Sequence, residues 1–369
     1  MATVSLLGYE ILVEPGALAR LGDLARAAAP AHRYAIVTDD AVGPLYAERA
    51  AASFGRGARV DVFTVPAGET HKTRESWARL TDALLTAGYG RDSAVVALGG
   101  GVVGDLAGFV AATFMRGVPV VQVPTTLLAM IDASIGGKTG VDTPQGKNLV
   151  GAFHQPAAVV ADTDVLATLP PAHLRAGLAE AIKHGVIASE EYFESVLAAL
   201  PSLLSASGAK HGVVEVVAGS VRIKADVVRR DVREGGLRKV LNFGHTVGHA
   251  VEHLSGYAML HGEAVAVGMA VESALAERVG VAERGTARRV REAVRAAGLP
   301  AAPPPDVARL GAAAVLDATR ADKKARAGRV EYALPCRVGA MAGEREGWSL
   351  PIADEEALAE IGRALEGAA

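Results

Sequence analysis

The chain has 369 residues, half of them apolar and 21% charged, so it is long enough to bury the cores of two domains. Its net charge of −3, with no stripe of Lys and Arg, argues against nucleic acid or anionic lipid as a partner. The sequence does not open on a basic segment and an apolar block, and Asp105 and Arg116 interrupt the apolar residues 94–123, so we expect neither secretion nor membrane insertion. The single cysteine, Cys336, rules out an internal disulfide and fits a reducing, cytoplasmic compartment.

The first half of the chain alternates short β-branched apolar runs with helical stretches, which is the pattern of parallel strands joined by helices. Strands are predicted at residues 34–38, 60–65, 94–98 and 119–123, and helices at residues 18–28 and 73–86. We therefore predict an α/β domain over residues 1–170, Rossmann-like with a mostly parallel sheet.

The second half changes character at Leu169-Pro170-Pro171, beyond which helix formers dominate and strand-like runs are few. Long helices are predicted at residues 172–187, 213–232, 245–253 and 263–278, a loop at 303–305 and a short strand at 330–334. Residues 171–369 are therefore predicted to form a mainly α-helical C-terminal domain.

A glycine cluster, residues 99–101, follows one predicted strand and opens a helix, where backbone amides and the positive helix end can hold a pyrophosphate. The spacing differs from the usual dinucleotide fingerprint, so a tight structural turn remains an alternative. Asp105, one turn later, is suited either to capping or to binding hydroxyls of ribose or substrate. Asp39 and Asp40 end another strand, where they bind ribose or form a turn. Residues 68–72 either cap the next helix or contact the cofactor.

Two lysines lie in glycine-rich stretches beyond a predicted strand, Lys138 after Gly136-Gly137 and Lys147 after Gly146. Lysines presented by flexible glycine loops are suited to oxyanions, although a solvated loop lysine is the alternative for either one alone. Together they indicate an anionic ligand.

Three histidines, His245, His249 and His261, lie at the starts of two predicted helices. Glu180 and Lys183 are three apart on an earlier helix in apolar company, which favours a pocket over a surface ion pair. Neutral imidazoles and a carboxylate are good ligands for a divalent metal such as zinc, whereas a lone histidine is more often structural. Spacing alone would pair His245 with His249 as two of the ligands.

Taken in order, these motifs resemble the 3-dehydroquinate synthase family from about residue 66 to residue 334. The most specific stretches are residues 99–105, 123–128, 136–139, 146–153, 177–185, 234–249, 261–263 and 322–324. The resemblance implies a phosphate-eliminating lyase of the shikimate pathway that converts 3-deoxy-D-arabino-heptulosonate 7-phosphate into 3-dehydroquinate and phosphate. The implied steps are transient oxidation by NAD, phosphate elimination, reduction and intramolecular aldol closure. A cytoplasmic homodimer is also implied.

The resemblance further implies a role for individual residues. It assigns the metal, Zn²⁺ or Co²⁺, to Glu180, His245 and His261, and gives His249 a substrate contact instead. Around NAD it places Asp39, Gly68, Glu69, Lys72, Gly101, Val102, Val103, Gly104, Asp105, Thr125, Thr126, Lys138, Lys147, Val165, Leu166, Ala167 and Thr168. For the phosphorylated sugar-acid substrate the corresponding residues are Asp132, Lys138, Asn148, Lys183, Lys224, Arg238, Asn242, His249, Lys323 and Lys324. Arg116 resembles an arginine that reaches the substrate phosphate from the partner subunit.

The nearest alternative is another sugar phosphate cyclase, acting on sedoheptulose 7-phosphate or a hexose phosphate in secondary metabolism. Such enzymes share the metal and NAD sites but differ where the substrate carboxylate is held. Lys224, Arg238 and Asn242 all match the 3-dehydroquinate synthase pattern. A polyol dehydrogenase has little use for so many cations, and a non-catalytic nucleotide-binding protein has no need of the metal set.

Overall fold

The computed structural model describes residues 1–205, 212–321 and 330–367, which form two compact units. The first unit comprises Met1–Leu169 and Val213–Ala225, and the second comprises Pro170–Gly212 and Asp226–Ala369. Helix α7 (Val213–Arg230) therefore begins in the first unit, which the hydrophobic pattern along the chain does not indicate. Among the helices in these described ranges, none combines the length and apolar character needed to cross a membrane.

The first unit is built on a seven-stranded sheet with the order β1-β2-β9-β6-β5-β3-β4. From β2 to β4 every neighbouring pair is parallel, and β1 adds an antiparallel edge strand. The strands are β1 (Ala2–Leu6), β2 (Tyr9–Val13), β3 (Arg33–Asp39), β4 (Arg59–Val65), β5 (Ser93–Gly99), β6 (Val120–Pro124) and β9 (Ala158–Ala161). The four predicted strands are thus confirmed as β3, β4, β5 and β6.

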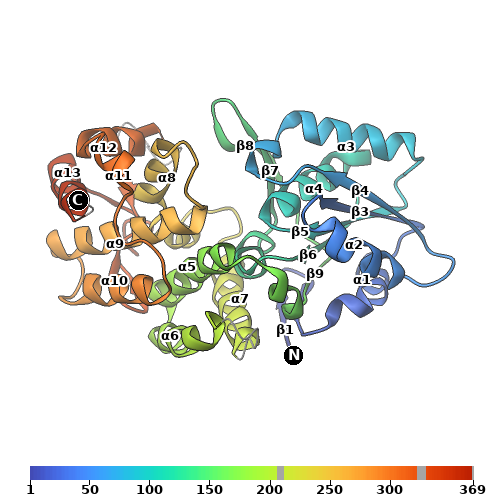
Figure 1. The fold of residues 1–369 in the computed structure, drawn as a ribbon, viewed down its shortest axis with the longest axis horizontal. Coiled ribbons are helices and arrows are strands. Elements are labelled where there is room, and N and C mark those ends of the chain that lie inside the picture. The colour runs from blue at the N-terminus through green and yellow to red at the C-terminus, as the bar shows by residue number, and fades with distance from the viewer. Residues whose placement is uncertain (206–211, 322–329, 368–369) are drawn as a thin grey trace. The chain divides into compact units, whose positions relative to one another are not determined.

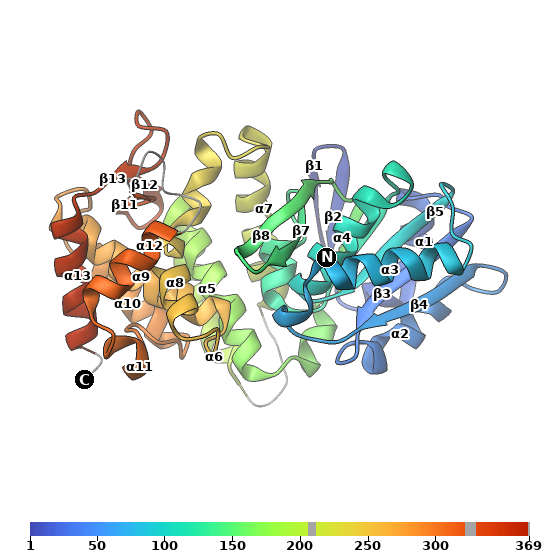
Figure 2. The same cartoon turned by 90° about the horizontal axis from the view of Figure 1, so that it is seen from above.

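Helices cover both faces of this sheet, as Figures 1 and 2 show. The helices are α1 (Leu21–Ala28) and α2 (Gly43–Ala52) on one face, and α3 (Arg74–Thr86) and α4 (Gly101–Thr113) on the other. Successive strand residues point to opposite faces, so Tyr34 stacks on Phe54 after α2, while Ala35 joins the core beneath α3 and α4. The predicted α/β class with a mostly parallel sheet is confirmed.

Two antiparallel hairpins were not predicted from the sequence. The turn between β1 and β2 has positive φ at Leu7 and Gly8, and leucine gives no turn signal at such a position. The second hairpin, β7 (Lys138–Thr143) with β8 (Gly146–Phe153), replaces the flexible glycine loops expected around Lys138 and Lys147, and that expectation was wrong. Its glycines serve close strand pairing instead, since a Cβ on Gly151 would lie 2.1 Å from the carbonyl oxygen of Thr139.

The second unit is mainly helical, as predicted. Its helices are α5 (Pro171–Ala188), α6 (Glu190–Leu203), α8 (His245–Leu254), α9 (His261–Arg278), α10 (Thr286–Ala296), α11 (Pro305–Ala308), α12 (Ala312–Ala321) and α13 (Asp354–Glu366). Two small antiparallel pairs accompany them: β10 (Glu331–Tyr332) with β13 (Leu350–Pro351), and β11 (Pro335–Arg337) with β12 (Ala340–Met341). The predicted helices correspond to α5, α7, α8 and α9, and the predicted strand at 330–334 shortens to β10.

Helix α9 is the central element of the helical unit, and every residue from 264 to 273 is buried. Its neighbours approach closely because glycines line the contacts. A Cβ on Gly262 would lie 2.0 Å from the carbonyl oxygen of Ala176 in α5, and one on Gly268 would lie 1.8 Å from that of Gly244, just before α8. The backbones of α5, α8 and α9 therefore meet at distances that a side chain would prevent.

Replacing Gly268 with Ala tests this packing. We expect the free energy of unfolding to fall by about 3 kcal/mol or more, because the added methyl group has only backbone atoms to displace. Urea denaturation of the ligand-free protein measures the change. The matched control is Gly362→Ala in α13, where the nearest atom to an added Cβ lies 4.0 Å away and helix propensity favours alanine by about 1 kcal/mol. Equal stability of the two variants would contradict the close approach.

Candidate active site

The carboxyl ends of the parallel strands lie along one edge of the sheet. Asp39 pairs with Val65 and Gly99 pairs with Pro124, so β3, β4, β5 and β6 end at matching levels. The strand order also reverses here, because the chain passes from β3 outward to β4 on one side and from β5 to β6 on the other. Open α/β sheets bind ligands at such a switch point. Several residues that the sequence assigns to the cofactor follow these strands. They therefore lie at the same edge of the sheet.

The glycine cluster joins β5 to α4 at this edge. A Cβ on Gly99 would lie 2.6 Å from the Val103 side chain, so the tight-turn alternative accounts for this glycine. Gly100 is the N-cap residue of α4 and has no side chain to cap the helix, so the amides that follow lie at the positive end of a 13-residue helix. Gly104 serves packing, because a Cβ there would lie 2.8 Å from the side-chain oxygen of Gln122.

Hydroxyl groups at the same edge support a polar ligand. Thr38 Oγ1 and Thr125 Oγ1 are buried and accept or donate no hydrogen bond within the described residues. Thr126 Oγ1 is used locally, accepting from the Ala129 N–H. Buried hydroxyls are normally hydrogen-bonded, so the orphaned pair fits a nucleotide bound along this edge.

Asp39 and residues 165–168 have structural partners as well. Asp39 Oδ1 accepts hydrogen bonds from the Ala41 and Val42 N–H groups, which is the turn that the sequence left open as an alternative. After β9, residues 163–168 form a 3₁₀ helix in which Val165 and Leu166 are buried while Ala167 and Thr168 are exposed. Tyr46 fixes this segment by donating to the carbonyl oxygen of Val165.

Lys72 is the centre of a buried ion network. Its Nζ lies 3.1 Å from Glu69, 3.1 Å from Asp105 and 3.9 Å from Asp142. Burial alone would lower the pKa of Lys72, but the three carboxylates outweigh it and raise the pKa above its ordinary value. Burial also raises the pKa of Asp105, against the opposing charge of Lys72. Asp142, which the sequence did not single out, completes the network from β7.

The remaining substrate and cofactor candidates of the first unit include residues of β7, β8 and α7. Lys138 is exposed at the start of β7, and Lys147 on β8 lies 3.9 Å from Glu69. Asn148 has a φ of 54°, and its N–H donates to Asp142 Oδ1. Lys224 of α7 is buried and lies 2.6 Å from Asp132 Oδ1, so these two substrate candidates form an ion pair.

Arg116 lies on the exposed end of the segment that follows α4. The backbone is left-handed at both Met115 and Arg116, with φ values of 52° and 69°. This conformation ends the helix and leaves the Arg116 side chain exposed.

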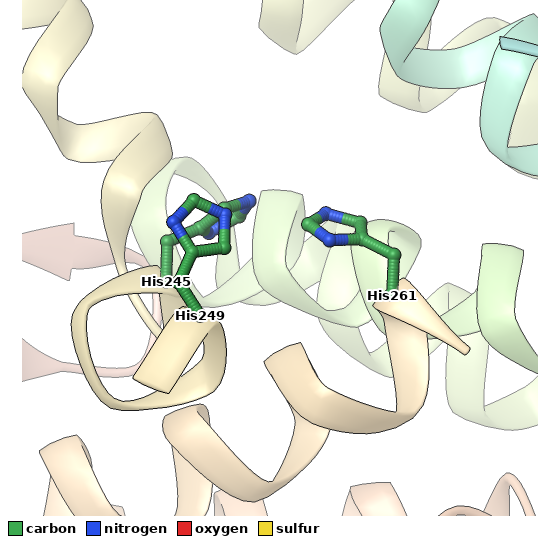
Figure 3. A group of neighbouring side chains, drawn as sticks. All are labelled: His245, His249 and His261. Atoms are coloured by element: carbon green, nitrogen blue, oxygen red, sulfur yellow. The ribbon is translucent and has the colours of Figure 1, made fainter. Parts of the chain in front are cut away.

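The three histidines converge in the second unit. His245 and His249 on α8 and His261 at the start of α9 point toward one another (Figure 3), and their nearest ring nitrogens lie within 4.8 Å of each other. Glu180 of α5 is fully buried, and its Oε1 lies 3.6 Å from His245 Nε2 and 3.8 Å from His261 Nε2. Lys183, also buried, forms an ion pair with Glu180 Oε2.

The donor set fits a divalent cation. Both carboxylate oxygens of Glu180 are buried; Oε2 is paired with the Lys183 ammonium, and Oε1 faces the Nε2 atoms of His245 and His261. His245 Nδ1 lies 3.1 Å from the carbonyl oxygen of Phe243, and His261 Nδ1 lies 3.5 Å from Glu252 Oε2. A histidine whose Nδ1–H has an acceptor presents Nε2 as a lone pair, which is how metal-binding histidines are oriented. Both Nε2 atoms are on the side of Glu180.

The other substrate candidates of this unit lie on the segment before α8. Arg238 is buried and donates to the carbonyl oxygen of Val232, while the Asn242 amide donates to Glu234 Oε1. Lys323 and Lys324 lie outside the described residues. Two buried acids of this unit, Glu252 and Glu272, were not predicted from the sequence. Their signal was the one that marked Glu180, a carboxylate within an apolar helical stretch.

A sheet edge of the kind that binds nucleotides in open α/β folds, and a buried carboxylate–histidine cluster of the kind that binds divalent cations, are the features expected of an enzyme class that uses both a nucleotide and a metal. Family models for the N-terminal and C-terminal parts of 3-dehydroquinate synthase match residues 62–176 and 177–325. The chain is 50% identical to the 3-dehydroquinate synthase of Symbiobacterium thermophilum, over 90% of this chain and 92% of that protein. It is 47% identical to that of Pelotomaculum thermopropionicum, over 90% and 88%. This chain belongs to the 3-dehydroquinate synthase family, as the sequence motifs indicated.

Solved structures show the same fold. A 2-deoxy-scyllo-inosose synthase complexed with carbaglucose-6-phosphate, NAD⁺ and Co²⁺ has a TM-score of 0.87 at 25% identity, covering 98% of this chain and all of that one. A 2-epi-5-epi-valiolone synthase from Streptomyces hygroscopicus subsp. jinggangensis, with NAD⁺ and Zn²⁺ bound, has a TM-score of 0.84 at 31% identity, covering 100% and 99%. A probable glycerol dehydrogenase from Sinorhizobium meliloti shares the fold alone, with a TM-score of 0.64 at 17% identity, covering 97% and 96%.

Replacing Lys72 with Met tests the ion network of the first unit. The variant leaves the carboxylates of Asp105 and Asp142 without their cation, so we expect the ligand-free protein to lose roughly 3 kcal/mol of stability in urea denaturation at neutral pH. A carboxyl group whose pKa is raised in the folded state lowers the free energy of unfolding at pH values above its unfolded-state pKa. This penalty is relieved as the pH falls through the folded-state pKa. The deficit should therefore shrink on acidification. Arg288→Met, which removes an exposed pair with Glu292, is the control and should change stability by less than about 1 kcal/mol. A deficit no larger than this control's would disprove the network's role.

Proposed function

We propose that this enzyme converts 3-deoxy-D-arabino-heptulosonate 7-phosphate into 3-dehydroquinate and phosphate, with NAD and Zn²⁺ or Co²⁺ as cofactors. The observation that supports it most is the convergence of buried Glu180 with His245 and His261, in a chain 50% identical to the 3-dehydroquinate synthase of Symbiobacterium thermophilum. Glu180, His245 and His261 would hold the metal, which would supply Lewis-acid chemistry toward the substrate hydroxyl, and NAD would supply hydride-transfer chemistry.

The proposed metal ligands are Glu180, His245 and His261, with His249 left to contact the substrate. Because His249 lies in the same cluster, it is positioned to hydrogen-bond a substrate oxygen next to the metal and to pass a proton. Helix periodicity pairs His245 with His249 because both lie on α8. It does not relate either residue to Glu180, which belongs to α5 and lies near His245 and His261.

We assign NAD to the carboxyl edge of the sheet. The amides at the start of α4 would hold the pyrophosphate, and the free hydroxyls of Thr38 and Thr125 supply further hydrogen bonds. Asp39 would bind ribose through the oxygen that its turn does not use. Lys72 contributes indirectly, since its ion pairs fix Asp105 and Glu69 beside the glycine cluster.

The substrate's two anionic ends are assigned to separate cation sets. Lys224 and Arg238, with Asn242, are assigned to the carboxylate, and Lys138, Asn148 and Lys183 to the phosphate and ring hydroxyls. Asp132 orients Lys224 through their ion pair. Donors held in place before the reaction stabilise charge that develops as phosphate leaves.

The proposal also includes a homodimer in the cytoplasm. The exposed Arg116, on a left-handed turn that projects beyond α4, would reach the phosphate bound by the partner subunit. Lys323 and Lys324 complete the assigned substrate set.

A phosphate-release assay with two substrates tests the assigned reaction. We expect purified, zinc-loaded protein with NAD to release phosphate from 3-deoxy-D-arabino-heptulosonate 7-phosphate and not from sedoheptulose 7-phosphate, and a chelator to abolish the release. Release from sedoheptulose 7-phosphate alone would move the protein to the cyclases represented by the valiolone synthase. It would also remove the assignment of Lys224 and Arg238 to a carboxylate.

Alanine variants of two histidines on α8 test the metal site. His245→Ala should lower the rate of phosphate release by more than about 100-fold, because even partners that only contact a metal ligand are worth 10- to 100-fold. His253→Ala removes an exposed histidine of α8 that contacts Tyr257, and should leave the rate within about twofold. Bound zinc, measured by elemental analysis, should fall only in the first variant. Full zinc content in His245→Ala would refute its role as a ligand.

A further inference from the structure

Glu272 of α9 is a fully buried carboxylate that binds the start of α8. Its Oε2 accepts a hydrogen bond of 2.7 Å from the Gly244 N–H, and its Oε1 accepts one of 2.9 Å from the Val247 N–H. Between these two donors lies His245, the first residue of α8. One carboxylate therefore holds the backbone on both sides of a proposed metal ligand.

Helix α8 has no cap of its own. Its N-cap residue is Gly244, with a φ of 78° and no side chain to accept from the first-turn N–H groups. Unpaired N–H groups in a buried first turn are costly, and the positive end of the helix attracts an anion. Glu272 satisfies both needs from another helix, which ties the position of α8 to that of α9.

The same face of α9 also approaches the backbone at the start of α8 closely. Gly268 lies one turn before Glu272, and a Cβ there would lie 1.8 Å from the carbonyl oxygen of Gly244. Helix α9 also carries His261 as its first residue. A single buried helix thus sets His261 directly, and sets His245 and His249 through Gly268 and Glu272.

We propose that Glu272 is a positioning residue of the histidine cluster, fixing the first turn of α8 so that the His245 and His249 rings meet His261. The proposal rests on the metal site assigned above. It extends that site by a carboxylate that need not touch the metal or the substrate. Its role is to hold the backbone from which two of the three histidines project.

Glu272→Gln is the test variant, because it keeps the shape but places an NH₂ group opposite one of the two N–H donors. We expect the affinity for Zn²⁺, measured by competition with a chromophoric chelator, to fall by about 10- to 100-fold. The visible spectrum of the Co²⁺-loaded protein should change in shape. Hydrogen exchange of the peptide containing Gly244 to Val247 should accelerate in the metal-free protein. Glu272→Asp, which keeps the charge but shortens the reach, should shift these quantities in the same direction and serves if the Gln variant does not fold.

Ser273→Ala is the matched control. Ser273 is equally buried, adjacent on α9, and donates to carbonyl oxygens of its own helix. It should match the parent in metal affinity and cobalt spectrum. Wild-type metal affinity and spectrum in folded Glu272→Gln, even with reduced thermal stability, would make Glu272 a structural cap only and overturn the proposal. Failure of the parent protein itself to bind Zn²⁺ or Co²⁺ would overturn both the metal site and this inference.

Discussion

Close backbone approach at glycine is the constraint on which the chemistry of the helical unit depends. A carboxylate and an imidazole have short side chains, so helices that contribute them to one cluster must lie near each other. Gly262 brings α9 against α5, which carries Glu180, and Gly268 brings α9 against the start of α8, which carries two histidines. Gly262 adjoins His261 in sequence, and Gly268 lies one turn before Glu272 on α9. Packing and ligand geometry are therefore set by the same residues.

In the α/β unit the corresponding constraint is the matched ending of parallel strands. Strand register fixes the level at which β3, β5 and β6 stop, and each stop is followed by a polar or glycine residue. Backbone amides at the start of α4, the hydroxyl of Thr38 at the end of β3 and that of Thr125 just after β6 then come to one edge without any long loop. Topology supplies the place, and the residues after each strand supply the chemistry.

The sequence predicted the elements whose signal is local. The buried strands β3, β5 and β6 contain apolar runs, the more exposed edge strand β4 is rich in β-branched residues, and α5 begins at a proline pair, so these elements were found. The hairpin of β7 and β8 was not found, because its glycines resemble those of a loop in sequence although they allow close pairing of the two strands. The candidate site residues were assigned from family motifs, because spacing relates only residues on one helix. Glu180, His245 and His261 come from three helices, and their meeting depends on tertiary packing that no periodicity encodes.

Two ionic clusters in this chain differ in how far the protein's own residues satisfy their buried charges. Lys72 is surrounded by three carboxylates whose combined charge stabilises its protonated form, so the network is satisfied by residues of its own unit. Glu180 Oε2 is paired with Lys183, whereas the buried Oε1 has no hydrogen bond from the described residues and lies 3.6 and 3.8 Å from imidazole nitrogens of His245 and His261. Desolvating a carboxylate is costly, and ordinary folding would satisfy it with donors. A buried carboxylate oxygen that faces two imidazole nitrogens is stabilised by a cation shared among them, and this is the observation behind the proposal of a metal at the histidine cluster; the Lys72 network needs no such cation.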